Sequence, residues 1–338
     1  MPAYNTAVFL GQALDSIFCQ TYRDFEVVVV DDGSVDNTRA VLCRYGDARL
    51  RVLTHRTNRG LSRSLNDALD AARGEYIVRM DADDTSLPGR LHSQVAFLDA
   101  HPDVGVVGAR VQPMDEAGRN RGEAQTVPLN SGHIRYLLPF TNCINHPTVA
   151  ARREVLESCG GYDPAAYPAD DYDLWLRVAE RSDLANQDEV LVRYRQHGAS
   201  VTTWWSSVGG GLDAEESVAH RSVERLLGHT VPFPAFVRAR RTVRGATPPT
   251  SAAEAREAIA VVQQVQLVTH RGPLDDEALA LIRADVAIRY ARLGLSCLQH
   301  NPWQFASFIR TAPIPTAALV AAIGRRAGRR VFRELRRF

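Results

Sequence analysis

Aspartates occur in two short groups whose spacing could serve chemistry. Asp81, Asp83 and Asp84 follow an apolar run in the segment MDADD, and Asp31 and Asp32 follow another in VDDGS. In an extended chain, side chains at i and i+2 point to the same side, so Asp81 and Asp83 are expected to face one ligand. Paired carboxylates supply the hard oxygen ligands that suit Mg²⁺ or Mn²⁺ shared with a diphosphate. The structural alternative is an acidic turn that only caps the following helix.

The elements that would position these acids follow from the hydrophobic pattern. The first 110 residues alternate strand-like and helix-like segments, which predicts an α/β fold with a mostly parallel sheet flanked by crossover helices. Strands are expected at 25–30, 50–53, 75–80 and 104–108, and helices at 10–18, 61–72 and 88–100. Ligands bind outside the carboxyl ends of parallel strands. Both aspartate groups stand at such ends, which favours a functional site there.

Farther along the chain the pattern changes twice. Residues 111–146 are rich in Gly, Pro and Asn and are expected to form long loops beside the site. Helical spacing returns at 170–181, and after a break near 206 the remaining chain has a mainly helical pattern with a Pro-rich interruption at 248–249. These changes predict a first domain over 1–204 and a helical region over 205–338.

Composition excludes several classes of protein. The chain of 338 residues is 45% hydrophobic and 23% charged, as in ordinary globular proteins. Its five cysteines form no C-x-x-C pair, which disfavours a disulfide scaffold or zinc ribbon and fits a reducing, cytoplasmic location. The absence of lysine excludes P-loops and pyridoxal Schiff-base enzymes. The longest late apolar run, 317–323, is far shorter than the about 20 residues that a membrane span needs.

An ordered series of short motifs resembles glycosyltransferase family 2. Along the chain the motifs are Met1–Asn5, Gln20–Tyr22, Val30–Ser34, Asn58–Leu61, Gly74–Ile77, Asp81–Asp84, Pro88 with Arg90–Leu91, His146–Pro147, Gly160–Asp163, Asp170–Trp175, and Tyr194–Arg195 with His197. Each motif alone is weak, but the ordered set over residues 1–204 is specific. The resemblance implies a GT-A fold, which is Rossmann-like, and transfer of a sugar from a nucleotide diphosphate with inversion at the anomeric carbon.

The resemblance assigns several residues to the nucleotide. Pro2, Ala3, Tyr4 and Asp32 would hold the base and ribose, and the Asp32 carboxylate would accept a hydrogen bond from the base. Arg63 could pair with the phosphates through its guanidinium group. The alternative is that Arg63 is solvated on the surface of its helix.

Other matches concern a metal ion. Asp81 and Asp83 match the D-x-D motif of the family. Asp83 is the expected direct ligand of Mn²⁺ or Mg²⁺, with Asp84 beside it. Asp81 would also contact the nucleotide. The cation would neutralise charge that builds up on the leaving diphosphate. His197 resembles a family histidine near the diphosphate or metal, and a purely structural role for it is equally open.

Asp171 matches the carboxylate that acts as general base in this family and removes the proton of the acceptor hydroxyl. Asp170 precedes it, and repulsion between adjacent acids raises at least one pKa. The structural alternative is that both acids stabilise the N-terminus of a helix, and the two interpretations are compatible. Trp204 and Trp205 are candidates for stacking on an acceptor sugar.

Two departures from the family pattern carry expectations of their own. The family has an apolar strand directly before the Pro2–Asn5 segment, and here Met1 falls at its end, so this first strand is expected to be essentially missing. The sequence also lacks the Gln-x-x-Arg-Trp motif of the processive synthases of the family. This difference predicts addition of one sugar per encounter.

Charge is divided unevenly along the chain. Residues 1–204 hold 28 acidic residues and 21 arginines, whereas 205–338 hold 11 and 19. In 323–338 apolar residues recur at i, i+4 among arginines, as in a cationic helix that lies on an anionic membrane and meets a lipid-linked acceptor. A docked terminal helix or a self-association surface is equally open. Nucleic acid is not an expected partner.

The leading hypothesis is a bacterial enzyme of cell-wall or exopolysaccharide synthesis. It would move one sugar from a nucleotide-diphosphate sugar to a hydroxyl of a glycan or lipid-linked acceptor, with Asp171 as base. One alternative is a catalytically silent homologue that binds nucleotide sugars, which the intact Asp81, Asp83 and Asp171 disfavour. A sugar-nucleotide pyrophosphorylase is a further alternative, but that class has an N-terminal Gly-rich loop and functional lysines, and this chain has neither.

Overall fold

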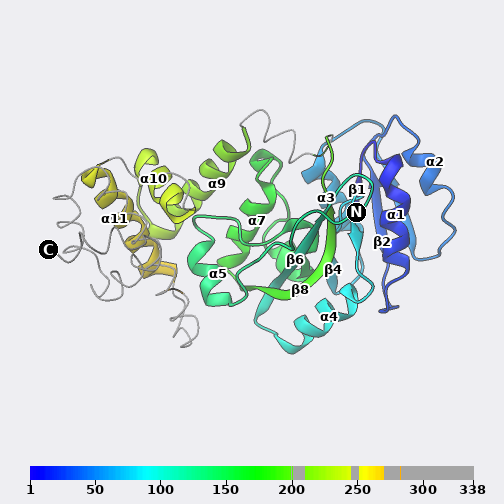
Figure 1. Cartoon of the computed structure of the whole chain (residues 1–338), viewed down its shortest axis with the longest axis horizontal. Helices are drawn as coiled ribbons and strands as arrows, with labels where there is room; N and C mark the ends of the chain where they lie inside the picture. Colours follow the sequence, from blue (N-terminus) through cyan, green and yellow to red (C-terminus); the bar gives the residue numbers. More distant parts are fainter. Residues whose placement is uncertain (199, 201–209, 245–250, 270–281, 283–338) are drawn as a thin grey trace. The chain divides into compact units, whose positions relative to one another are not determined.

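The computed structural model describes residues 1–198, 200, 210–244, 251–269 and 282 (Figure 1). The chain divides into two compact units. The first combines Met1–Ser131 with Asn142–Val218, and the second combines Gly132–Thr141 with the described residues from Ala219 on. The assignment of 1–204 as a catalytic domain and 205–338 as a helical region stays a prediction about function.

A parallel three-stranded sheet forms one half of the first unit. Its strands lie in the order β1-β2-β3 and have the bounds Pro2–Ala3, Val27–Asp31 and Leu50–Thr54. The helices between and after them are α1 (Ala7–Phe18), α2 (Thr38–Leu42) and α3 (Leu61–Ala71). Leu10 and Leu14 of α1 pack on Val27 and Val29 of β2 in one buried cluster. Each such side chain stabilises the fold by about 1.5–3 kcal/mol.

The first strand of this sheet is shorter than the others. Pro2 pairs with Val30 and Ala3 pairs with Asp31, in parallel register. The strand expected to be essentially missing is the one before Pro2, so that expectation stays a prediction beside this two-residue strand. The pairing of Pro2 and Ala3 places Tyr4 directly after β1, beside the carboxyl end of β2.

The second sheet has five strands in the order β4-β7-β6-β8-β5. Their bounds are Tyr76–Val78 for β4, Thr85–Ser86 for β5, Val104–Met114 for β6, Ala150–Arg152 for β7 and Asp183–Arg195 for β8. Only β6 and β8 pair in parallel, and the other pairs are antiparallel. The predicted α/β class is confirmed, but this sheet is mixed because β5 and β7 run opposite to β4, β6 and β8.

The stretch expected to be irregular contains regular elements at both ends. Strand β6 continues past the predicted end at Gly108 to Met114, with irregular pairing to β8 near Val104 and Arg110. Helix α5 occupies Ser131–Leu137. Except for Ser131, α5 belongs to the second unit. The other helical elements of the first unit are α4 (Arg90–Ala100), η1 (His146–Thr148), α6 (Arg153–Ser158), η2 (Pro164–Ala166) and α7 (Asp170–Ala179).

Helices alone make up the described residues of the second unit beyond α5, as the sequence predicts for the C-terminal region. Helix α9 spans Gly210–Leu227 and continues from the first unit, α10 spans Phe233–Arg244, and α11 spans Ala252–Thr269. Arg240 is buried, and its Nε donates to the Phe140 carbonyl at 3.0 Å. Among the described helices, none combines the length and apolar character that crossing a bilayer requires.

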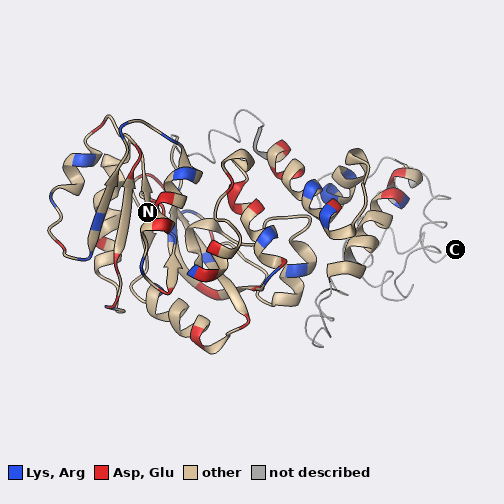
Figure 2. Ribbon diagram, turned by 180° about the vertical axis from the view of Figure 1, so that it is seen from behind, with Lys and Arg blue, Asp and Glu red and all other residues tan. Residues whose placement is uncertain are grey.

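Charge on these helices is nearly balanced. Figure 2 shows both basic and acidic positions on α9 and α11, whereas α10 carries arginines and no acidic residue. Residues 270–338 hold 12 arginines and five acidic residues, so the excess positive charge of the C-terminal region lies mainly there. The proposed membrane-binding segment 323–338 falls outside the described residues, as do Trp204 and Trp205.

Candidate functional site

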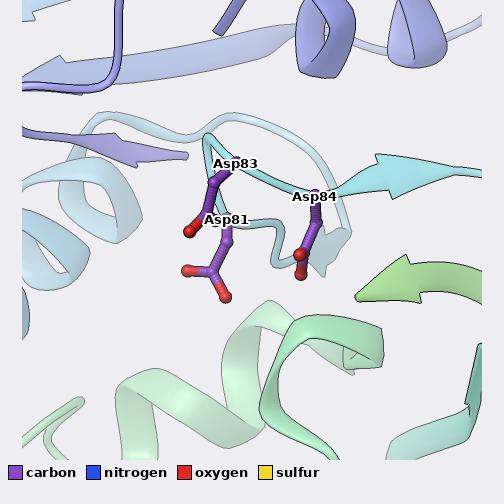
Figure 3. Close-up of side chains that lie close together, drawn as sticks. All are labelled: Asp81, Asp83 and Asp84. Carbon is purple, nitrogen blue, oxygen red and sulfur yellow. The ribbon is translucent and has the colours of Figure 1, made fainter. Parts of the chain in front are cut away.

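Three carboxylates meet on the loop that follows β4. Asp81, Asp83 and Asp84 each offer an oxygen atom, and these atoms all lie within 4.8 Å of one another. Figure 3 shows the three side chains pointing to the same side of the loop. Asp81 and Asp83 therefore face a common point, as expected, but a turn at Ala82–Asp83 and not an extended chain brings them there, and Asp84 joins them.

Neighbouring side chains hold each of these acids. Arg79, which is almost completely buried, forms an ion pair with Asp81. The Nε2 atom of His197 lies 2.9 Å from Oδ2 of Asp83, and the backbone N–H of Arg195 donates to Oδ1 of Asp84 at 2.7 Å. The acids are thus positioned by residues from β8 and from the chain just before the loop.

The cluster carries more negative charge than its surroundings compensate. Burial, reinforced by Asp81 and Asp83, raises the pKa of Asp84 well above its usual range. Burial also raises the pKa of Asp81, against the attraction of Arg79. The Oδ2 atom of Asp84 is buried without a hydrogen-bond partner. Three converging carboxylates, one of them with a buried oxygen that no hydrogen bond satisfies, provide the oxygen ligands that a hard divalent cation prefers. The residues present therefore fit Mg²⁺ or Mn²⁺.

A second acidic pair opens helix α7. Burial, with the charge of Asp170, raises the pKa of Asp171 to about 7. The side-chain amide of Asn142 donates to Oδ2 of Asp171 at 3.0 Å, and the N–H of Tyr172 donates to Oδ1 at 2.7 Å. Asp171 is therefore oriented and holds a pKa at which a carboxyl can both accept and release a proton near neutrality.

Asp170 has a different environment from its neighbour. Its side chain is 2% exposed, and the Ser62 hydroxyl of α3 donates to its Oδ2 at 2.5 Å. Burial raises its pKa although this hydrogen bond opposes the shift. Ala169 is the N-cap of α7, so neither acid caps the helix through its side chain in the strict sense, although both lie in its first turn. Asp170 ties α3 to α7.

Arg79 acts on both acidic groups. Its positive charge lowers the pKa of Asp171 as well as that of Asp81, although burial outweighs it in each case. It also contributes, after burial, to a pKa of His146 well below its usual range. Because His146 is then neutral, its Nε2 can accept from the Tyr162 hydroxyl 3.0 Å away. Arg79 is the cation that links the two groups.

The carboxylates after β2 have complete sets of partners. Asp32 is 3% exposed and accepts from the backbone N–H groups of Arg59 at 2.8 Å and Gly60 at 2.9 Å. Its Oδ1 also lies 2.6 Å from Nδ1 of His55, whose Nε2 lies 2.8 Å from Asp67. These contacts leave little capacity for the predicted hydrogen bond to a nucleotide base. That role of Asp32 stays a prediction.

A glycine allows these loops to approach each other. Gly33 has φ of +72°, and a Cβ atom there would lie 2.5 Å from the carbonyl carbon of Thr57. A side chain at this position would therefore push the loop that carries Arg59 and Gly60 away from Asp32. The D-D-G segment of the sequence thus serves backbone packing as well as charge.

The other residues assigned to the nucleotide lie near the end of the first sheet. Pro2 and Ala3 are buried in β1, and Tyr4 is 46% exposed. Asn5 next to it joins the loop after β2, because its Oδ1 accepts from the N–H of Val35 at 2.9 Å. Arg63 is exposed on α3. The structure leaves the nucleotide roles of these residues as predictions.

Several residues of the site escaped the sequence analysis. Arg79, His55, Asn142 and Ser62 act through contacts with residues far along the chain or, for Arg79, from a buried strand end. Only Arg79 had a usable signal, because a charged residue inside an otherwise apolar run needs a nearby partner.

Comparison with known proteins gives one family. The profile of "Glycosyl transferase family 2" matches residues 1–160. Amylovoran biosynthesis glycosyltransferase AmsE of Erwinia amylovora is 34% identical over 189 residues, which cover 55% of this chain and 70% of AmsE. O-antigen biosynthesis glycosyltransferase WbnJ of Escherichia coli is 34% identical over 209 residues, which cover 59% of this chain and 79% of WbnJ.

Solved structures share the fold. TarS 1–349 of S. aureus, solved with UDP-GlcNAc, has a TM-score of 0.56 at 20% identity, over 91% of this chain and 90% of that one. The mannosyltransferase PcManGT of Pyrobaculum calidifontis, solved with GDP-Man and Mn²⁺, has a TM-score of 0.53 at 23% identity, over 95% and 84%. At these identities the likeness establishes the GT-A type of α/β fold, with its helical C-terminal region.

Proposed function

Because this chain belongs to glycosyltransferase family 2, we propose that it transfers one sugar from a nucleoside-diphosphate sugar to a hydroxyl of a glycan or lipid-linked acceptor, with inversion at the anomeric carbon. The observation that carries the proposal is the pairing of a converging carboxylate cluster at Asp81–Asp84 with an oriented carboxyl, Asp171, whose pKa is near 7. Bacterial relatives named for amylovoran and O-antigen biosynthesis support a role in polysaccharide synthesis.

Asp171 is the proposed general base. Its lone pairs that do not face Asn142 and Tyr172 accept the proton of the acceptor hydroxyl. The acceptor oxygen then bonds to the anomeric carbon while the bond from that carbon to the diphosphate oxygen breaks, and the electron pair leaves with the diphosphate. Attack from the face opposite the leaving group inverts the configuration. A positioned base of this kind contributes about 10²–10⁴ in rate.

Asp83 and Asp84, with Asp81, are the proposed ligands of Mn²⁺ or Mg²⁺. When bound, the cation neutralises charge on the leaving diphosphate. His197 contacts Asp83 and so orients that ligand, and its predicted role as a direct ligand would require this hydrogen bond to open. Arg79 holds Asp81 in place and adds a positive charge beside the acids.

Other parts of the proposal come from the sequence pattern alone. A cytoplasmic location is predicted from the scattered cysteines. Contact of 323–338 with an anionic membrane, and through it with a lipid-linked acceptor, stays a proposal. So does single-sugar transfer.

A donor screen tests the proposal. Release of nucleoside diphosphate from UDP-, GDP- and dTDP-sugars would be measured with Mn²⁺ and with EDTA, in the wild type, Asp83→Asn and Asp188→Asn. Asp188 is a matched control because it is an exposed acid that pairs only with Arg110 in the described residues. One nucleotide series should support release that EDTA and Asp83→Asn abolish and Asp188→Asn retains. Equal release by Asp83→Asn would contradict the proposal, and metal-dependent binding without release would favour a silent homologue.

A further inference from the structure

Arg195 is a buried cation whose role in the site has not been assigned. It ends β8, is 1% exposed, and is among the largest fully buried side chains of the described residues. Burial lowers its pKa, and the charges of Asp83 and Asp84 oppose that shift. A buried charge costs several kcal/mol unless its surroundings compensate it. The groups that Arg195 binds should therefore explain why a charged side chain is buried here.

Its contacts reach three separate segments. The guanidinium Nε donates to the carbonyl of Asp83 at 2.7 Å, and the backbone N–H donates to Oδ1 of Asp84 at 2.7 Å. Nη1 donates to the carbonyl of Glu116 at 2.7 Å, and Nη2 donates to Oε1 of Gln12 on α1 at 2.7 Å. One side chain thus binds the acidic loop, the turn after β6 and the first helix.

The planar group is also fixed by stacking. Its central carbon lies 4.7 Å from the ring centroid of Phe9, and the ring of His197 lies 4.8 Å from the same phenyl ring. His197 also contacts Asp83. Phe9 therefore packs against both Arg195 and His197, two residues that bind the acidic loop. The fork geometry of arginine, with donors in fixed directions, suits this arrangement better than a lysine would.

The turn that Arg195 holds is compact. The N–H of Gly118 donates to the Asp115 carbonyl at 2.9 Å, and the N–H of Asp115 donates to the Arg119 carbonyl at 2.8 Å. Gly118 has φ of +80°, and a Cβ atom there would lie 3.7 Å from Nη1 of Arg195. A change in this turn would therefore reach the guanidinium directly.

We propose that Arg195 is a positioning residue that sets the geometry of Asp83 and Asp84 for the divalent cation and couples the cation site to the turn at Asp115–Gly118. This inference rests on the proposed function, since it assumes the cation. It adds that affinity for the cation depends on a turn that contributes no carboxylate to the cluster.

Arg193 provides a matched control. It lies two residues earlier on β8 and binds the same turn region, through the Gly118 carbonyl and through Oδ1 of Asn120 at 2.9 Å. The backbone of Arg193 pairs with Thr85, next to Asp84, but among the described residues its side chain forms no hydrogen bond or ion pair with Asp81, Asp83 or Asp84. Replacing the Arg193 side chain therefore disturbs the turn from the same strand while leaving the bonds to Asp83 and Asp84 in place.

The test measures affinity for Mn²⁺ alone, from the free Mn²⁺ signal in electron paramagnetic resonance, so no turnover is needed. Arg195→Met should raise the Kd for Mn²⁺ about tenfold or more, in line with the loss of partners behind metal ligands. Arg195→Lys, which keeps a positive charge but not the fork, should recover part of the affinity. Arg193→Met, which disturbs the turn but leaves the bonds to Asp83 and Asp84 in place, should raise the Kd less, by about threefold at most. Equal Kd values for wild type and a folded Arg195→Met would overturn the proposal.

A second pair of variants covers the case in which Arg195→Met does not fold. Gly118 and Gly122 both have positive φ, but a Cβ at Gly122 would meet no atom within 4 Å. Gly118→Ala should raise the Kd for Mn²⁺ about threefold or more, and Gly122→Ala should leave it nearly unchanged. Equal effects of the two would overturn the coupling. Thermal unfolding by circular dichroism, run beside each titration, separates a loss of stability from a loss of affinity.

Failure of the proposed function has a different signature. If the wild type binds no Mn²⁺, with or without added UDP or GDP, the cation itself is refuted and this inference falls with it. If the wild type binds Mn²⁺ and all Arg195 and Gly118 variants bind it equally, only the coupling is refuted.

Discussion

The acids after β2 and the acids after β4 occupy equivalent places, yet their surroundings are opposite. Asp32 accepts two backbone N–H groups and faces His55, so its carboxylate is satisfied within the fold. Asp84 keeps a buried oxygen without a partner, beside two further carboxylates. A pair of aspartates at a strand end is therefore not by itself evidence of a ligand site. The decisive feature is whether the fold supplies the compensating donors.

This contrast predicts different costs for the two groups. Acids whose partners lie within the chain stabilise the fold, because a charged hydrogen bond contributes about 1.5–3 kcal/mol. Acids that repel one another in a buried place destabilise the fold, and at Asp81–Asp84 a bound cation would relieve that cost. Burial beside Asp170 raises the pKa of Asp171 in a similar way, although Asp171 accepts two hydrogen bonds. Activity is expected to depend on the second kind, and stability on the first.

The largest expected effect is on catalysis. Asp171→Asn keeps the size of the side chain and one of its two accepted hydrogen bonds but removes the proton acceptor, so turnover should fall about 10³-fold. Binding of the nucleotide donor, measured by calorimetry, should stay within about threefold, because the base acts on the acceptor. Asp163→Asn serves as a control, since Asp163 is an exposed acid at the start of η2. Full activity of Asp171→Asn would show that another residue acts as the general base.

A smaller effect concerns the free energy of unfolding. Asp32→Asn replaces an acceptor that faces three donors and should lower it by about 2 kcal/mol. Asp84→Asn removes a charge that has no cation to balance it, and should leave the metal-free protein unchanged or more stable. Urea unfolding in EDTA at neutral pH measures both. A loss of the same size in both variants would remove the distinction between the two acidic groups.

The most gradual effect is a dependence of stability on pH. Asp171 in the folded protein has a pKa of about 7, above the usual value of 3.8, so between these values the folded state binds more protons than the unfolded state. Stability of the metal-free protein should therefore fall as pH rises from about 4 to 7, by up to about 4 kcal/mol. The slope should be reduced in Asp171→Asn. Stability that rises across this window in the wild type, with the same slope in the variant, would contradict the assignment.

The parts of this account that the sequence predicts are those with local signals. Apolar runs ending in acids mark β2 and β4, and the helical spacing after Asp170 marks α7. Strand β8 has no such signal, because its middle residues, such as Gln187 and Asp188, are polar and it is buried only toward its ends. The partners of the acids are equally hidden, since His55 and Asn142 reach Asp32 and Asp171 across 23 and 29 residues of chain.

The measurement that tests the central claim most directly is a calorimetric titration of Mn²⁺ without nucleotide, since Asp32 is itself a predicted nucleotide contact, in wild type, Asp83→Asn and Asp32→Asn. The account predicts that the site present in the wild type is lost in Asp83→Asn and retained in folded Asp32→Asn, because the cluster after β4 holds a buried oxygen without a partner, whereas the Asp32 carboxylate is satisfied within the fold. Binding of Mn²⁺ that survives Asp83→Asn, or that disappears in folded Asp32→Asn, would contradict it.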